Sequence, residues 1–259
     1  MSSIGILGWL VLHPKHWVDI PSVIKQRLTR GERAENRALA NEQCRERAVP
    51  VSTLTELVPG FQLVAFDELY RPQVEEARSR CAASPVSMGG AADLSLIFSL
   101  AEAVAAVKVV ETGVAYGWSS LALLSSLSRR PGSLLISVDR PYPGLKNDPY
   151  VGIAVPDEYR ANWRLLRESD RRGIPQALEL AGAPDICHYD SDKSYEGRMW
   201  GYRRLWNALR PGGLLVSDDI SDNTAFLDFA DRTGAPSSIV ASGSKFVGVI
   251  VKPPAQMPR

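Results

Sequence analysis

Acidic side chains stand where two apolar runs of the chain end. Asp190 closes the run 185–190, and Asp218 and Asp219 close the run 213–219. In an open α/β sheet, ligands bind at the carboxyl ends of the strands, and neighbouring strands lie about 4.8 Å apart. We therefore expect the three carboxylates to converge. Their mutual repulsion then requires a counter-charge, for which a hard cation or a lysine is the simplest candidate.

A second group of residues has the spacing of a mononucleotide-binding unit. An apolar strand ends near Glu111, Gly113 and Gly117 follow in a turn, and an apolar helix begins at Ser119. Glycine allows positive φ, so a ligand can approach the backbone, and the helix start offers free N–H groups. The next apolar run ends in Asp139, where a nucleotide-binding fold presents a carboxylate to ribose hydroxyls. The alternative is a tight turn of the kind that any α/β protein tolerates.

The sequence of this unit also indicates which cofactor it binds. The fingerprints G-x-G-x-x-G and G-x-x-x-x-G-K-[ST] are absent. The pattern E-x-G-x-x-x-G-x-S at 111–119 instead resembles the first motif of class I S-adenosylmethionine-dependent methyltransferases. The resemblance implies that the loop wraps the amino-acid end of the cofactor, that Asp139 holds the ribose and that Asp170 reads the adenine. Asp190 would contact the cofactor too, and Trp118 would pack the loop or line the pocket.

The strand-end acids carry a second resemblance. Asp-Ser-Asp-Lys from Asp190, then Pro-Gly-Gly, an apolar strand and Ser-Asp-Asp, is similar to the cation-dependent O-methyltransferases of small molecules. These include the catechol, caffeoyl-coenzyme A and macrolide sugar enzymes. The resemblance implies that Asp190, Asp218 and Asp219 hold Mg²⁺ and that Lys193 removes the substrate proton. A lysine beside such a cation would have a depressed pKa, which suits a base. A similar bacterial methyltransferase group carries His at the position of Lys193, which leaves the base open.

The same residues have plainer interpretations. Asp190 could contact the cofactor or an ordered water without any metal. Asp219 could cap the helix that begins near Asn223, and Lys193 could be a solvated lysine at a helix start. His188 shares a strand face with Asp190, and we expect it to be a core histidine with satisfied hydrogen bonds.

Composition excludes several classes of protein. The 259 residues carry a net charge of +1, so nothing argues for nucleic acid or an anionic membrane as a partner. No apolar stretch is long enough to span a bilayer, and no basic region precedes the apolar segment at Ile4, so we expect no secretory signal. Three widely spaced cysteines indicate a cytoplasmic protein with free thiols.

The order of elements predicts the fold class. Strands alternate with helices from Lys108 onward, which is typical of an α/β, Rossmann-like, doubly wound sheet. We expect seven strands, mostly parallel, with a terminal antiparallel hairpin. The expected strands are 108–112, 134–139, 162–168, 185–190, 213–219, 237–241 and 246–252. The third is ambiguous, because four arginines recur there at helical spacing: Arg160, Arg164, Arg167 and Arg171.

We expect the chain to be divided into two parts. Residues 1–87 would form an N-terminal helical extension that serves as a cap or an oligomer contact, and residues 88–259 the S-adenosylmethionine-binding methyltransferase domain. The apolar segment Ile4–Leu12 favours a homodimer. The leading hypothesis is Mg²⁺-assisted O-methylation of a small-molecule hydroxyl, on a secondary metabolite or a sugar. The alternatives are a metal-independent small-molecule N- or O-methyltransferase, and a non-catalytic binding module on the same scaffold.

Overall fold

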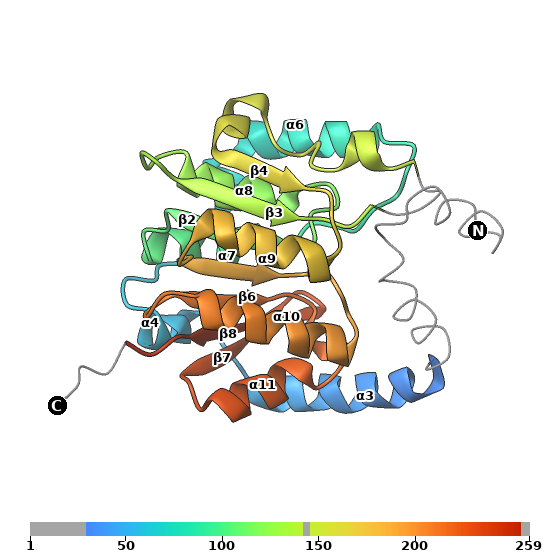
Figure 1. Cartoon of the computed structure of the whole chain (residues 1–259), viewed down its shortest axis with the longest axis vertical. Helices are drawn as coiled ribbons and strands as arrows, with labels where there is room; N and C mark the ends of the chain where they lie inside the picture. Colours follow the sequence, from blue (N-terminus) through green and yellow to red (C-terminus); the bar gives the residue numbers. More distant parts are fainter. Residues whose placement is uncertain (1–29, 142–145, 255–259) are drawn as a thin grey trace.

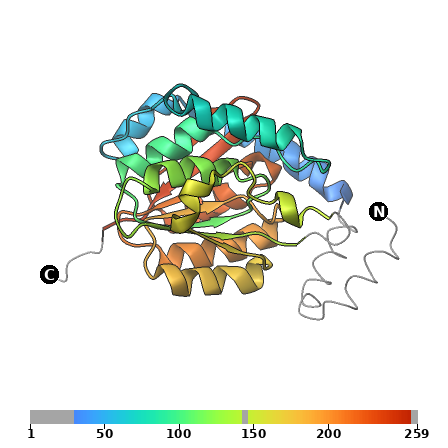
Figure 2. The ribbon, with the colours of Figure 1, turned by 90° about the horizontal axis from the view of Figure 1, so that it is seen from above.

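A single twisted sheet runs through the molecule, with helices on both of its faces (Figures 1 and 2). The structure is a computed structural model, and it describes residues 30–141 and 146–254. The segment Ile4–Leu12, on which the expected homodimer rests, lies outside the described residues. Within the described ranges, no helix is long and apolar enough to cross a membrane.

The sheet confirms the expected doubly wound architecture. Its strand order is β1-β7-β8-β6-β5-β2-β3-β4. The strands β2, β3, β4, β5 and β6 are parallel neighbours, whereas β8 runs antiparallel to both β6 and β7 and forms the terminal hairpin. The bounds are β1 Ala48–Val49, β2 Lys108–Thr112, β3 Leu134–Val138, β4 Trp163–Leu166, β5 Ile186–Tyr189, β6 Leu214–Ser217, β7 Ser237–Ser242 and β8 Lys245–Val251.

Side chains alternate between two hydrophobic cores, one on each face of the sheet. In β2, Val109 belongs to one core and Val110 to the other, because successive side chains of a strand point to opposite faces. Both faces are covered, so the strands read as continuous apolar runs in the sequence. This burial explains why most strand positions could be predicted from apolar runs.

The helices divide between the two faces. Helices α4 to α8 contribute to the core that holds Val109, and α3 with α9 to α11 contribute to the core that holds Val110. Figure 2 shows the two layers on either side of the sheet. The bounds are α3 Arg30–Arg47, α4 Leu54–Leu57, α5 Phe66–Leu69, α6 Arg71–Ala82, α7 Leu94–Ala103, α8 Trp118–Leu127, α9 Asp170–Ala181, α10 Tyr195–Ala208 and α11 Ala225–Thr233. Short 3-10 helices are η2 Val51–Thr53, η3 Asp148–Tyr150, η4 Asp157–Asn162 and η5 Ile220–Asp222.

The ambiguous third strand is confirmed, with shorter bounds than expected. It is β4, and it pairs in parallel with β3 from Leu135↔Trp163 to Val138↔Leu166. The arginines at helical spacing fall on four different local structures: η4, β4, the following loop and α9. Their spacing therefore does not reflect a continuous helix, and the sheet decided the local conformation.

The N-terminal part of the chain contributes a strand to the sheet. Residues Ala48 and Val49 form β1, an eighth strand that the sequence did not predict, which pairs in parallel with β7. A strand of two residues is too short to produce a recognisable periodicity. Helix α3 lies beside η5 and α11, where Arg47 pairs with Asp231 at 3.2 Å. The division of the chain at residue 87 stays a prediction.

Candidate active site at the strand ends

The turn between β2 and α8 requires glycine at two positions. Gly113 and Gly117 have φ angles of +81° and +90°, which side chains rarely adopt. A Cβ atom on Gly113 would lie 2.3 Å from the carbonyl oxygen of Asp190. One on Gly117 would lie 2.9 Å from the Cα atom of Gly152. The turn is therefore pressed between the end of β5 and the segment that follows η3, at the carboxyl edge of the sheet.

Glu111 fixes this turn from below. It is fully buried at the end of β2, and its carboxylate accepts hydrogen bonds of 2.6 Å from the hydroxyls of Ser119, Ser120 and Ser137. A buried carboxylate is costly unless hydrogen bonds replace its hydration. The three hydroxyls do so and tie α8 and β3 to β2. Glu111 and Ser119, both expected to contact the cofactor, thus contact each other, and their role toward the cofactor stays a prediction.

Asp139 stands at the end of β3, where the ribose carboxylate was expected. It accepts a hydrogen bond of 2.9 Å from the backbone N–H of Val114, in the glycine turn. Its other oxygen pairs with Arg167, whose guanidinium also contacts Asp148 in η3. Asp139 therefore links the glycine turn to the segments after β3 and β4. The sequence offered no signal for Arg167, which lies in a run of arginines and is selected only by the strand register.

Asp170 begins α9 and turns toward the end of β5. Its carboxylate accepts hydrogen bonds from the hydroxyl of Ser191 at 2.6 Å and of Tyr189 at 3.2 Å. Burial of this carboxyl raises its pKa to about 6, against the opposing effect of the Ser191 hydrogen bond. The adenine role expected for Asp170 stays a prediction.

Two buried polar atoms flank this edge without a hydrogen-bond partner among the described residues. They are Ser169 Oγ, at the end of β4, and Asn147 Oδ1, in the segment after β3. An unpaired buried polar atom costs free energy, which a polar ligand bound there would recover. Ser169 and Asn147 are close in sequence to Arg167 and Asp148, which form a chain of contacts with Asp139. The edge around Asp139 therefore suits a ligand that carries hydroxyl and amino groups, as adenosine does.

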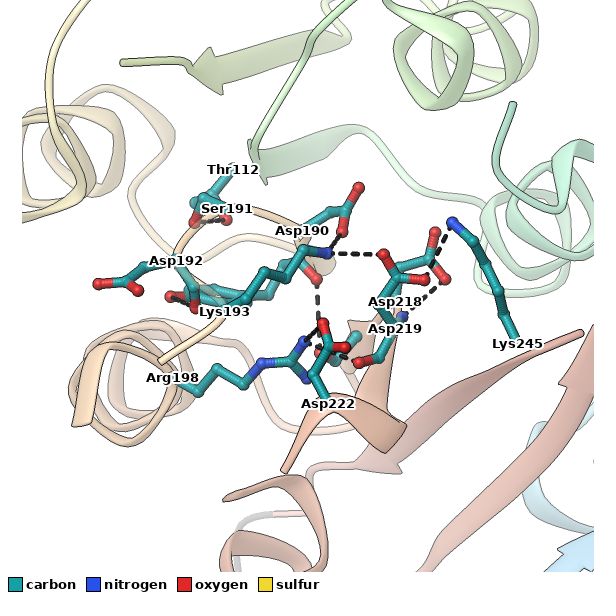
Figure 3. Close-up of polar contacts among 12 residues, drawn as sticks. Thr112, Asp190, Ser191, Asp192, Lys193, Arg198, Asp218, Asp219, Asp222 and Lys245 are labelled. Atoms are coloured by element: carbon teal, nitrogen blue, oxygen red, sulfur yellow. Dashed lines mark hydrogen bonds and ion pairs between the residues drawn. The ribbon is translucent and has the colours of Figure 1, made fainter. Parts of the chain in front are cut away.

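Two lysines and two aspartates meet at the ends of β5 and β6 (Figure 3). Lys193 Nζ contacts Asp190 Oδ1 and lies 3.0 Å from Asp219 Oδ2. Lys245 Nζ lies 2.9 Å from Asp219 Oδ1. Asp190 and Asp218 reach this edge because their backbone N–H groups continue the ladder, to the carbonyls of Thr112 and Tyr189. The expected convergence of strand-end acids is thus present, and the counter-charge is supplied by lysine.

These contacts set the charge states of the cluster. Burial opposes the charge on Lys193, but attraction to Asp190 and Asp219 outweighs it and raises the pKa of the ammonium. Burial raises the pKa of Asp190 to about 6, against the pull of Lys193. Burial also acts on Asp219, but the ammonium groups of Lys193 and Lys245 prevail and lower its pKa. Lys193 is therefore held protonated, in contrast to the depressed pKa expected for a base beside a metal ion.

A buried arginine supports Asp219 from behind. Arg198, in α10, is fully buried, and its Nη2 atom donates to the backbone carbonyl of Asp219 at 2.8 Å. The same atom lies 3.6 Å from Asp222 Oδ2. Asp219 has a φ angle of +51°, which is uncommon for a residue other than glycine. The arginine therefore stabilises a strained backbone that turns the Asp219 carboxylate toward the two lysines.

The expected Mg²⁺ ligands do not fit a divalent cation in this arrangement. Both carboxylate oxygens of Asp219 and one of Asp190 are paired with ammonium groups, and Asp218 Oδ1 accepts the backbone N–H of Asp219 at 2.9 Å. Within residues 30–141 and 146–254, no group of three His, Cys, Asp or Glu side chains is arranged to hold a metal. A cation at this edge would have to displace lysine.

His188 is buried, as expected, but its hydrogen bonds are not satisfied. In the described part of the chain, neither ring nitrogen has a hydrogen-bond partner, and Nδ1 lies 3.9 Å from Glu111 Oε1. Burial lowers the pKa of the imidazole. The apolar residues Ile186 and Val216 lie beside His188. The prediction of a satisfied core histidine is therefore only half right.

A cavity of about 320 Å³ lies next to the glycine turn. It is bounded by α5, α6, the start of α7 and the indole of Trp118, the first residue of α8. The ion pair between Arg78 and Asp67, 2.7 Å long, lies on its wall. The cavity also includes Asp93, whose carboxylate caps α7 through the N–H of Leu96. Trp118 thus lines a cavity, and its expected role in packing the loop or lining the cofactor pocket stays a prediction.

Comparisons with known proteins relate part of the chain to a methyltransferase family and its fold to O-methyltransferases. Residues 110–220 match a protein family described as a methyltransferase domain. A search of the curated proteins found no match to the chain. The fold is similar to an O-methyltransferase from Bacillus cereus solved with S-adenosylhomocysteine, at 13% identity over 81% of this chain and 100% of that one, with a TM-score of 0.58. It is also similar to the O-methyltransferase TomG of Streptomyces achromogenes, involved in tomaymycin synthesis and solved with S-adenosylmethionine. That match has 18% identity over 73% of this chain and 92% of the other, with a TM-score of 0.52.

Proposed function

We propose that this chain, which carries a class I S-adenosylmethionine-dependent methyltransferase domain, methylates a hydroxyl group of a small molecule. The observation that carries the proposal is the double role of Asp190. Its backbone carbonyl packs against Gly113 of the glycine turn, and its carboxylate pairs with Lys193. One residue thus joins the cofactor turn to the groups that can handle a proton.

The residues around the turn suit the cofactor. S-adenosylmethionine carries a methyl group on a sulfonium. An acceptor oxygen would attack this methyl carbon in line, forming the O–C bond while the C–S bond breaks and S-adenosylhomocysteine leaves. The Gly113 turn would hold its amino-acid end, and Asp139 with the unpaired hydroxyl of Ser169 would hold the nucleoside. Arg167 keeps Asp139 in place through their ion pair.

The lysine cluster suits the acceptor. Proton removal from the hydroxyl makes its oxygen a better nucleophile, and a positive charge nearby stabilises the developing negative charge. In this proposal Asp190 accepts the proton, since burial raises the pKa of its carboxyl to about 6. Lys193, held as an ammonium, stabilises the acceptor oxygen. The roles differ from those inferred from the resemblance, where Lys193 is the base.

A second space that suits a small molecule lies beside Trp118, and the residues that line it do not include Asp190, Lys193 or Asp219. The cavity of about 320 Å³ is at the lower end of the range of small-ligand pockets, which is roughly 300–1,000 Å³. Its walls combine the Trp118 ring with the Asp67–Arg78 pair, so it suits a molecule with both apolar and polar groups. The family resemblance favours a secondary metabolite or a sugar.

The competing version of this proposal is Mg²⁺-assisted methylation. It follows from the resemblance to cation-dependent enzymes and requires Lys193 and Lys245 to withdraw from Asp219. A metal-independent N-methyltransferase and a non-catalytic binding module on the same scaffold are two further candidate functions. A homodimer, a cytoplasmic location and a cap formed by residues 1–87 stay predictions.

Calorimetric titration with S-adenosylhomocysteine tests the proposal. We expect micromolar binding, both in Mg²⁺ and in EDTA, because in this proposal Lys193 and Lys245 supply the counter-charge of the strand-end aspartates. Asp139→Asn should weaken binding, since it loses the charge that pairs with Arg167 and holds the turn. The matched control is Asp157→Asn, whose side chain is 91% exposed and remote from the turn in sequence. Absence of binding in both buffers would overturn the methyltransferase proposal.

A further inference from the structure

We propose that Lys193 and Lys245 together act as a built-in counter-cation for the strand-end aspartates, so that this site binds no divalent metal ion. The proposal deepens the proposed function, on which it rests, and assigns Lys245 as a positioning residue. Nothing in the sequence pattern pointed to Lys245, which lies at the start of β8.

The contacts of Asp219 carry the argument. Each of its two carboxylate oxygens has its own ammonium partner, Lys193 at 3.0 Å and Lys245 at 2.9 Å (Figure 3). Lys193 also contacts Asp190, so it bridges the ends of β5 and β6. A divalent cation would need these same oxygens, because Mg²⁺ takes carboxylate oxygens at roughly 2.0–2.1 Å. Ion and lysines are therefore mutually exclusive.

The formal charges agree. Asp190, Asp218 and Asp219 bring three negative charges to the edge, and the two lysines bring two positive charges, as many as one divalent ion would. Adding the ion on top of the lysines would place mutually repelling cations within contact distance. The pair of lysines thus meets the need for a counter-charge, for which the sequence left a hard cation or a lysine as candidates and the resemblance implied Mg²⁺.

The sheet register explains how Lys245 arrives. Strand β8 runs antiparallel to β6, and Gly248 pairs with Ser217. Because the two strands are antiparallel, Asp219, two residues after Ser217, and Lys245, three residues before Gly248, lie at the same edge of the sheet. The residue is therefore delivered by the terminal hairpin, whereas Lys193 comes from the loop before α10. Asp219 is fixed between them because Arg198 holds its backbone carbonyl.

Magnesium titration of the metal-free full-length protein tests the proposal. We expect no saturable Mg²⁺ binding by the wild type, and equal affinity for S-adenosylhomocysteine in Mg²⁺ and in EDTA. The double variant Lys193→Met with Lys245→Met leaves Asp190 and Asp219 without their ammonium partners, so it should gain saturable Mg²⁺ binding. A merely structural lysine would not produce that gain. Lys108→Met is the matched control. Lys108 is the first residue of β2, at the opposite edge of the sheet from the carboxyl ends of the strands, and its Nζ donates to the carbonyl of Gly132.

Two outcomes would overturn the proposal. The first is saturable Mg²⁺ binding by the wild type that Asp219→Asn abolishes. The second is a folded double variant that binds S-adenosylhomocysteine but gains no Mg²⁺ binding. If the double variant does not fold, Lys245→Met alone frees one oxygen of Asp219 and takes its place in the titration. If the wild type does not bind S-adenosylhomocysteine, the proposed function is refuted. The Mg²⁺ titration tests the role of the lysines independently of that result.

Discussion

At the scale of single residues, the site is governed by how buried charges are compensated. Glu111 has three serine hydroxyls, and Asp219 has two ammonium groups and an arginine behind its backbone. A buried charge without such partners is costly, and removal of one partner costs more than the pair contributes. Asp170 accepts hydrogen bonds from the hydroxyls of Tyr189 and Ser191, and the effect of its burial on the pKa outweighs these hydrogen bonds and the attraction of Arg140.

The burial of Asp170 predicts a pH effect on stability. Burial raises the pKa of Asp170 to about 6 in the folded protein, so the folded state favours the protonated carboxyl. The stability that protonation provides is complete below about pH 4 and is lost as pH rises through about 6. We therefore expect Asp170→Asn, which cannot ionise, to gain up to about 3 kcal/mol in free energy of unfolding relative to wild type as pH rises across this window.

Urea unfolding of both proteins at several pH values measures this gain. The exposed Asp157→Asn serves as the control, because its carboxylate is 91% exposed. A difference between Asp170→Asn and wild type that stays constant with pH would show that the pKa of Asp170 is the same in the folded and the unfolded protein, which would contradict the prediction.

At the scale of elements, two turns contain a glycine with positive φ, but only one of these glycines also lies against a neighbouring strand end. Gly113 and Gly132 both have positive φ, +81° and +72°. A Cβ on Gly113 meets the Asp190 carbonyl, whereas one on Gly132 has nothing within 4 Å. The first turn is therefore constrained by the neighbouring strand end, and the second only by its own backbone.

Alanine substitutions should reveal the contrast. Gly132→Ala should cost roughly 1–2 kcal/mol of stability, the cost of a left-handed conformation for a residue with a Cβ. Gly113→Ala should cost more and should weaken S-adenosylhomocysteine binding, because the turn must move away from Asp190. Urea unfolding and calorimetric titration measure the two effects. Equal losses for both variants, with binding intact, would contradict the close approach.

At the scale of the whole molecule, the packing around the sheet encloses two of the three thiols. Cys44 lies in α3 and Cys187 in β5, both buried, whereas Cys81 in α6 is partly exposed. Burial raises the pKa of Cys44 to about 11 and raises that of Cys187 as well. All three are free, as the sequence predicted.

Alkylation with iodoacetamide should therefore be ordered. Cys81 should react first in the native protein, and Cys44 and Cys187 should react only on global or local unfolding, because the thiolate is the nucleophile and neither is accessible. Peptide mass spectrometry over time, with a sample in denaturant as the control, measures the order. Rapid labelling of Cys44 in native buffer would show that α3 detaches from the sheet.

The sequence by itself determined most strands of the sheet, the glycine turn and the position of the strand-end acids. Burial on both faces produces apolar runs, and a turn that permits only glycine shows itself in Gly113 and Gly117. These are local consequences of backbone geometry and burial, so a single sequence carries them. The resemblance to methyltransferases rests on the same residues.

Only the tertiary structure decided what surrounds those acids. Lys245 reaches Asp219 through the antiparallel register of β8, and Arg167 reaches Asp139 through the pairing of β4 with β3. The two-residue strand β1 likewise exists only because β7 offers it an edge. Contacts between residues far apart in the chain depend on register and packing, which no local pattern records. The need for a counter-charge could therefore be predicted from the sequence, but the pair of lysines that supplies it could not.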